Sequence, residues 1–85
     1  MKIWGITMAK AYIYKGANGN SIFFASNTKR ARFIAFKDLA GEESFNDMVV
    51  ERMEELDYLD HVDGYVMKSS RASDRIQLQK AGIIN

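Results

Sequence analysis

The only histidine of this chain, His61, lies among carboxylates in the sequence. This is the pattern that comes closest to a catalytic or metal-binding site. Asp57, Asp60 and Asp63 surround it. A histidine beside carboxylates can act as a general base or as a metal ligand. The spacing differs from that of a calcium-binding loop, and the sequence has no cysteine to supply a thiolate ligand. We favour a solvated acidic turn over a catalytic or metal site, and expect no cofactor.

Two further patterns lack the residues that their chemistry requires. The serines Ser69, Ser70 and Ser73 have no histidine partner in sequence, so a hydrolase is disfavoured. Residues 16–19 are too few for a phosphate-binding loop and lack its Gly-Lys-Ser/Thr ending. We therefore expect a protein that is not an enzyme.

Charged residues are strongly segregated along the chain. Residues 1–37 carry seven basic side chains and no acidic one, whereas residues 38–67 carry ten acidic side chains and one basic, Arg52. The formal net charge of +1 hides this separation. Such asymmetry indicates either a charged partner or pairing between the two segments inside the molecule.

The acidic segment is the first candidate binding surface. A dense set of carboxylates can occupy the phosphate-reading groove of a basic protein, imitating nucleic acid by charge. The alternative is a solvated loop, paired in part with the protein's own basic helix. The residues expected to bind a partner protein are Glu51, Glu54, Glu55, Asp57 and Asp60.

The basic segment is the second candidate, as a nucleic-acid-binding helix. Its cations are Lys29, Arg30, Arg32 and Lys37. With Phe33 and Phe36 they can grip phosphates and stack on bases. A further stacking platform on adjacent strands would consist of Tyr12, Tyr14, Phe23 and Phe24. Against both, so small a domain needs many of its aromatic residues in its core, and the pI of about 8.0 is low for a nucleic-acid module.

The length of 85 residues predicts one small domain, residues 1–85, with 47% apolar side chains to build a core. No apolar run approaches the roughly 20 residues of a membrane span. The absence of cysteine fits a bacterial cytoplasm. A domain of this size gains stability from association, so a monomer and a small homo-oligomer both stay open.

Residues 10–40 predict a β-hairpin followed by a helix. β-Forming residues predict strands at 10–15, with an extension back toward Ile3, and at 21–25, joined by an Asn18-Gly19 turn. Residues 27–40 predict a helix that ends at Gly41. Its buried stripe is Ala31, Ile34, Ala35 and Leu39.

Residues 45–59 allow two interpretations. Their apolar residues recur at helical spacing, but Met48-Val49-Val50 favours a strand, which would complete a three-stranded sheet. The acidic residues 54–63 then form a loop or one helical turn. Further on, 65–67 predicts a short strand, and Ser73 or Asp74 is expected to cap a final helix over 75–81.

The order of these segments resembles a group of small phage and prophage proteins of unassigned function. The residues that carry the resemblance are 22–27 (Ile-Phe-Phe-Ala-Ser-Asn), 29–36, 45–53 (Phe-Asn-Asp-Met-Val-Val-Glu-Arg-Met), 55–57, 74–76 and 80–82. The resemblance implies a third strand at about 46–53, which we adopt, and no enzyme activity. It also implies a viral accessory protein that binds a host or phage protein, as anti-CRISPR inhibitors of defence nucleases do.

We therefore predict an α+β fold with strands and helix in the order β-β-α-β, one packed helix and a short C-terminal helix. The expected core is Ile13, Ile22, Phe24, Ala31, Ile34, Ala35, Leu39, Val49 and Leu56. The expected function is non-enzymatic: binding and modulation of a host protein, such as a defence (CRISPR) nuclease, through the acidic surface. The alternative is a small nucleic-acid-binding module that uses the basic helix.

Overall fold

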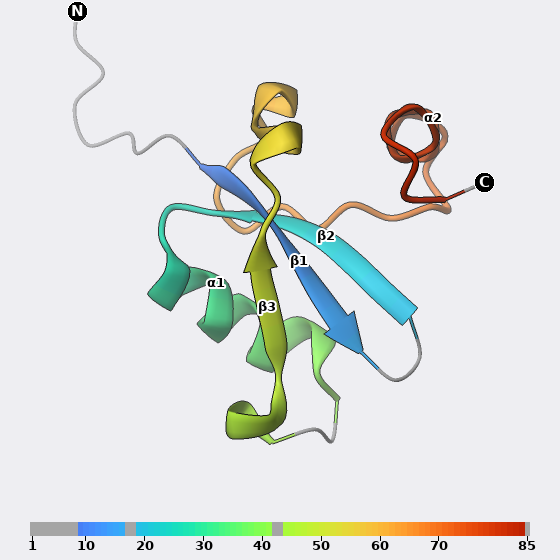
Figure 1. The fold of residues 1–85 in the computed structure, drawn as a ribbon. Helices are drawn as coiled ribbons and strands as arrows, with labels where there is room; N and C mark the ends of the chain where they lie inside the picture. The colour runs from blue at the N-terminus through green and yellow to red at the C-terminus, as the bar shows by residue number, and fades with distance from the viewer. Residues whose placement is uncertain (1–8, 17–18, 42–43, 85) are drawn as a thin grey trace, which may run out of the picture.

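The computed structural model describes residues 9–16, 19–41 and 44–84, and they form a small α+β fold. Its centre is an antiparallel sheet of three strands in the order β2-β1-β3 (Figure 1). The strands are β1 (Lys10–Gly16), β2 (Gly19–Ala25) and β3 (Val49–Arg52). The predicted fold class and the predicted order of elements are both confirmed.

The predicted hairpin is confirmed in β1 and β2. The pairing of the two strands runs from Lys10 opposite Ala25 to Gly16 opposite Gly19. Gly19 has a φ of 125°, a conformation that a side chain would disfavour, which explains a glycine at this end of the turn. Asn18 and the expected extension of the first strand to Ile3 lie outside the described residues.

Two helical segments follow the hairpin where one helix was predicted. The α-helix α1 (Thr28–Ile34) continues into a π-helical turn, η1 (Ala35–Leu39). The side chain of Asn27 caps α1 by accepting a hydrogen bond from the Arg30 amide at 2.8 Å. The amide of Ala40 donates to the Ala35 carbonyl, five residues back, and Gly41 then ends the helix with a positive φ. The predicted span of 27–40 is correct, but the π turn was not predicted.

The strand interpretation of residues 45–59 holds only for the four residues of β3. A 3-10 turn, η2 (Phe45–Asp47), precedes β3, and a 3-10 helix, η3 (Glu54–Leu59), follows it. Val49 is exposed, so its expected place in the core is wrong. Val50 lies opposite Tyr14 and packs on the core instead, because successive residues of a strand face opposite sides.

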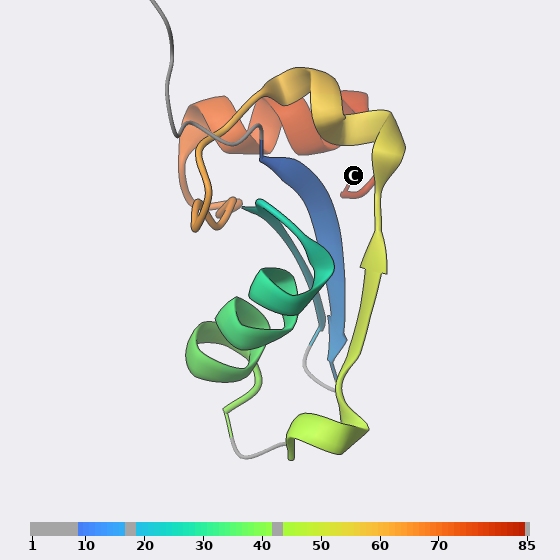
Figure 2. The same cartoon turned by 90° about the vertical axis from the view of Figure 1, so that its left-hand side faces the viewer.

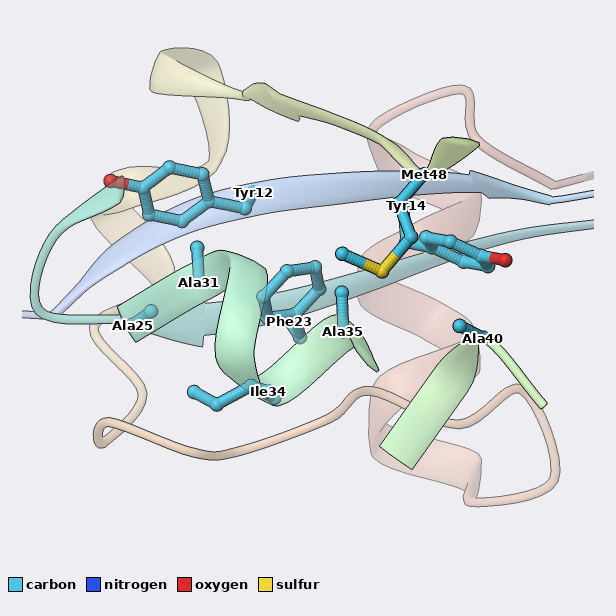
Figure 3. Close-up of a cluster of buried hydrophobic side chains, with 9 residues drawn as sticks. All are labelled: Tyr12, Tyr14, Phe23, Ala25, Ala31, Ile34, Ala35, Ala40 and Met48. Atoms are coloured by element: carbon cyan, nitrogen blue, oxygen red, sulfur yellow. The ribbon is translucent and has the colours of Figure 1, made fainter. Parts of the chain in front are cut away.

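Both faces of the hairpin are buried, which explains the unbroken run of buried residues in each strand. On one face, α1 and η1 cover Tyr12, Tyr14, Phe23 and Ala25 (Figures 2 and 3). The small side chains of Ala31 and Ala35 point at the sheet and let the helix approach it closely. The opposite face carries a second cluster of Ala9, Ala11, Ile13, Ile22, Phe24, Leu56, Met67 and Leu78.

The segment after η3 extends the sheet beyond β2. Val66 forms a single antiparallel bridge with Phe23, so the short strand predicted at 65–67 is present as one bridge. The Phe24 amide donates to the Tyr65 carbonyl at 2.9 Å, and the Met67 amide donates to the Ile22 carbonyl at 2.9 Å. No helix within the described ranges is long and apolar enough to cross a membrane.

The C-terminal helix, α2 (Ala72–Lys80), is anchored by a buried carboxylate. Asp74 is 1% exposed. It accepts hydrogen bonds from the Tyr65 hydroxyl at 2.8 Å, the Lys68 amide at 3.0 Å and the Arg71 guanidinium at 2.8 Å. Although burial opposes ionisation, these donors keep the pKa of Asp74 below its usual value. The expected cap at Ser73 or Asp74 is therefore wrong: the helix begins earlier, and its cap residue is Arg71.

Replacing Asp74 by alanine should destabilise the protein by about 3 kcal/mol, because the Lys68 amide, Tyr65 and Arg71 lose one shared acceptor. Thermal or denaturant unfolding measures this loss. Ser73→Ala is the matched control on the same turn and should leave stability within about 0.5 kcal/mol. Equal losses for the two variants would contradict the anchoring role.

Candidate functional site

The five acidic residues chosen from sequence do not lie together as one free surface. Glu51 points away from the core and pairs with Lys15 at 2.9 Å. Asp57 is half-buried against β1. The remaining three, Glu54, Glu55 and Asp60, are exposed on η3 or at its end. The structure thus separates a structural carboxylate from those available to a partner.

Asp57 completes the hydrogen bonding of the sheet where β3 turns away from β1. The Met53 amide donates to the Ala11 carbonyl at 2.9 Å, as the ladder requires. The Ala11 amide, however, donates to Asp57 Oδ1 at 2.8 Å. Arg52 donates two hydrogen bonds to the same carboxylate, at 2.8 and 2.9 Å, and a third to the Ala11 carbonyl at 3.0 Å. The pair therefore holds the start of η3 against the first strand.

These contacts set the protonation of both partners. The hydrogen bonds from Arg52 lower the pKa of Asp57 to about 2; burial opposes this shift, and the Ala11 amide adds to it. The hydrogen bond to Asp57 likewise raises the pKa of Arg52. Asp57 is thus a structural residue that stays ionised.

Stability should fall in acid partly through Asp57. Its folded pKa lies below the ordinary value of 3.8, so the stabilisation is complete above about pH 5 and is lost as the pH falls toward 2. Since the carboxylate is partly exposed, we expect this contribution to be about 1 kcal/mol after solvent screening. Denaturant unfolding between pH 7 and 2 should show a flatter profile for Asp57→Asn than for the wild type.

Glu55→Gln is the control for this profile, because Glu55 is exposed and has no ion-pair partner within the described ranges. It should follow the wild-type curve. Parallel profiles for Asp57→Asn and the wild type would show that the pair does not couple stability to pH.

Two apolar side chains on or just after η3 are unusually exposed, as are Glu54, Glu55 and Asp60; of these carboxylates, Glu54 lies 4.0 Å from the Arg52 guanidinium. Tyr58 is 69% exposed and Val62 is 72% exposed. A 3-10 helix repeats every three residues, so Glu55 and Tyr58 project from the same side. We call Glu54, Glu55, Tyr58, Asp60 and Val62 the acidic η3 surface.

The predicted basic helix is partly neutralised by the acidic segment. Arg30 Nε donates to Asp63 at 3.0 Å, and the same carboxylate accepts from the Ser26 amide at 2.7 Å. Arg32 donates to the Phe45 carbonyl at 2.9 Å and lies over the Phe45 ring. Lys29 and Lys37 are exposed and have no ion-pair partner among the residues that the structure describes. Internal pairing thus accounts for part of the charge segregation.

Three phenylalanines lie exposed beside these cations. Phe33, Phe36 and Phe45 are 51%, 45% and 42% exposed. Phe36 meets Phe45 edge-to-face with ring centroids 5.7 Å apart, and the guanidinium of Arg30 lies 5.7 Å from the centre of the Phe33 ring. We call Lys29, Arg30, Phe33, Phe36, Lys37 and Phe45 the aromatic-basic face.

The stacking platform predicted on the strands is wrong. Tyr12, Tyr14, Phe23 and Phe24 are all 5% exposed or less. The first three pack under α1, and Phe24 packs in the second cluster. Because both faces of the hairpin are covered, no aromatic ring of β1 or β2 is open to a base.

His61 packs among aromatic rings, and its neighbouring aspartates point elsewhere. Its ring stacks on Tyr65 at 4.1 Å and meets the edge of Phe24, while Nε2 lies 3.2 Å from Gln77 Oε1. Asp57 is held by Arg52 and Asp63 by Arg30. Within the described ranges, no group of three histidines or carboxylates has the arrangement of a metal site. His61 is half-buried, and Asp57 and Asp63 are engaged in ion pairs, so the expected solvated acidic turn is wrong for all of these residues except the exposed Asp60.

Sequence reasoning did not select Tyr58, Val62 or Phe45 as surface residues. Phe45 belonged to an apolar repeat that favoured a buried helical stripe. Tyr58 and Val62 each have an aspartate as a direct neighbour in the sequence, but so does Leu56, which is buried. No local signal therefore distinguishes the exposed apolar residues of this segment from the buried one.

Comparison with known proteins adds no relationship: no family model, curated protein or solved structure matches the chain. The functional argument therefore depends on the two exposed surfaces. They lie over opposite faces of the sheet, because α1 packs on the first cluster and Leu56 of η3 on the second (Figure 2).

Proposed function

We propose that this protein is a non-enzymatic binding protein whose acidic η3 surface docks on a basic partner protein. The observation that carries the proposal is that exposed carboxylates and exposed apolar side chains occur together on η3 and just after it. Glu54, Glu55 and Asp60 supply negative charge, and Tyr58 and Val62 supply contact area. Charge alone would be consistent with a solvated loop, but exposed tyrosine and valine are not needed for solvation.

Both components have a defined role in binding. Carboxylates complementary to a basic surface speed association and select the partner. A tyrosine contributes large contact area at low entropic cost and is enriched among the residues that dominate binding energy. The Arg52–Asp57 pair supports this role because it holds η3 against β1 and limits the ordering that docking requires.

The partner that this chemistry fits best is a protein with a phosphate-reading groove. A row of carboxylates on a small rigid domain can occupy such a groove in place of nucleic acid. Together with the resemblance to phage accessory proteins, this leads us to propose a host nucleic-acid-handling protein, such as a defence nuclease, as the target. Binding there would exclude nucleic acid and so modulate the enzyme.

The proposal is tested by affinity capture from a nuclease-treated bacterial lysate. We expect the wild-type protein to retain a specific basic protein that heparin releases, since heparin is a polyanion that competes for a phosphate-reading groove. Glu54→Gln/Glu55→Gln/Asp60→Asn should reduce retention at least tenfold, because the complementary charges are lost. Tyr58→Ala should reduce it about as strongly.

Asp38→Asn is the matched control, since Asp38 is an exposed carboxylate on η1, outside the acidic η3 surface. It should bind like the wild type. Retention that survives the triple substitution, or that heparin leaves unchanged, would rule out docking through this surface.

A further inference from the structure

We propose that the aromatic-basic face is a second binding site and that its ligand is single-stranded nucleic acid. This face is formed by the outward side of α1, by η1 and by η2, and it is separate from the surface assigned to the protein partner. The observations that carry the inference are the exposure of its phenylalanine rings, the way those rings are held, and the cations placed along them.

The exposure of Phe33 and Phe36 follows from how the helix packs. Ala31, Ile34 and Ala35 take the inward positions under the sheet (Figure 3). Phe33 and Phe36 take the intervening outward positions, where 51% and 45% of their surface is exposed. The π turn begins at Ala35 and includes Phe36, and such turns are frequent at functional sites.

Phe45 is brought to this face from another part of the chain and is held in place there. Arg32 donates to the Phe45 carbonyl at 2.9 Å, and its guanidinium lies 4.7 Å from the centre of the Phe45 ring. Phe36 meets the Phe45 ring edge-to-face, with an angle of 65° between the two rings. The rings are thus ordered before a ligand arrives, which lowers the entropic cost of stacking.

Cations lie at both ends of the row of rings. Lys29 lies in α1 and Lys37 in η1, eight positions apart in the sequence. Arg30 engages Asp63 through Nε at 3.0 Å. Arg32 is occupied with Phe45 and orients its ring. Of the four predicted nucleic-acid-binding cations, it is therefore the one that we do not expect to contact phosphate.

This pattern fits a single strand better than a duplex or a protein. A single strand offers alternating phosphates and unstacked bases, which match cations placed around flat rings. A duplex hides the faces of its bases, so the phenylalanines would have no role. An acidic protein segment would satisfy the lysines, but its carboxylates offer no flat face on which the phenylalanine rings could stack. Asp38, beside Lys37, and Asp47 in η2 repel phosphate as well as carboxylate. Those two carboxylates also limit the length of strand that the face can hold.

Fluorescence anisotropy with labelled oligothymidylate of about 12 nucleotides, in about 50 mM salt, tests the proposal. The wild-type protein should bind this probe and bind a hairpin duplex of the same charge at least tenfold more weakly. Phe33→Ala/Phe36→Ala should weaken binding at least tenfold, because stacking surface is lost. Lys29→Gln/Lys37→Gln should also reduce the slope of log affinity against log salt by about 1.4, or roughly 0.7 for each phosphate contact.

Ile76→Ala is the matched control for the ring variant, because Ile76 is as exposed as Phe33 but lies on α2. It should leave oligothymidylate binding unchanged. The Glu54→Gln/Glu55→Gln/Asp60→Asn variant should also bind the oligonucleotide like the wild type. Failure of the protein-docking proposal can therefore be distinguished from failure of this one. The unfolding midpoint of each variant confirms that it is folded.

Three results would overturn the inference. One is the absence of oligothymidylate binding by the wild-type protein in low salt. Another is equal affinity for single strand and duplex, and the third is unchanged affinity in the ring variant. If the ring variant instead loses a captured protein while no oligonucleotide binds, the face recognises an acidic protein segment and the nucleic-acid proposal is wrong.

Discussion

The contact on which the rest of this fold depends is the pair formed by Arg52 and Asp57 at the end of β3. There the third strand turns away from the hairpin, and a ladder amide, that of Ala11, would be left without a partner. The Asp57 carboxylate accepts that hydrogen bond, and Arg52 satisfies the carboxylate with two donors. An unsatisfied amide at this position would cost about 1–3 kcal/mol. The pair therefore lets the chain leave the sheet and places η3 where Leu56 enters the second cluster.

Ion pairs between basic and acidic residues provide tertiary contacts in this chain, in which the two kinds of charge are segregated along the sequence. Lys15 pairs with Glu51 across neighbouring strands, Arg30 with Asp63, and Arg71 with the buried Asp74. The exposed pairs are individually weak, but each joins segments far apart in the sequence or adds to a hydrogen-bond network. Carboxylates used in this way are not available to a partner. The carboxylates that stay exposed on η3, of which Glu54 still lies 4.0 Å from Arg52, define the acidic η3 surface, and the exposed Lys29 and Lys37 belong to the aromatic-basic face.

A hairpin buried on both faces also decides which aromatic residues can function in binding. The aromatic rings of β1 and β2 are buried in the two clusters. To the first cluster, the helix contributes mainly small side chains. As a result, the exposed rings come from α1, η1, η2 and η3, which lie outside the sheet. Two surfaces over opposite faces of so small a domain can contact two different partners without competing for space.

Local chemistry in the sequence was enough to determine the hairpin, the helix over 27–40 and its inward stripe, because turn glycines, caps and apolar spacing act over a few residues. The structure of residues 45–59 depended on tertiary contacts. Val50 rather than Val49 faces the core because pairing with Tyr14 sets the register of β3. Asp74 was expected as a cap, yet Tyr65, Lys68 and Arg71 bury it, and no local pattern specifies that network. The choice of free surface residues was likewise decided by packing, since burial depends on what the other elements cover.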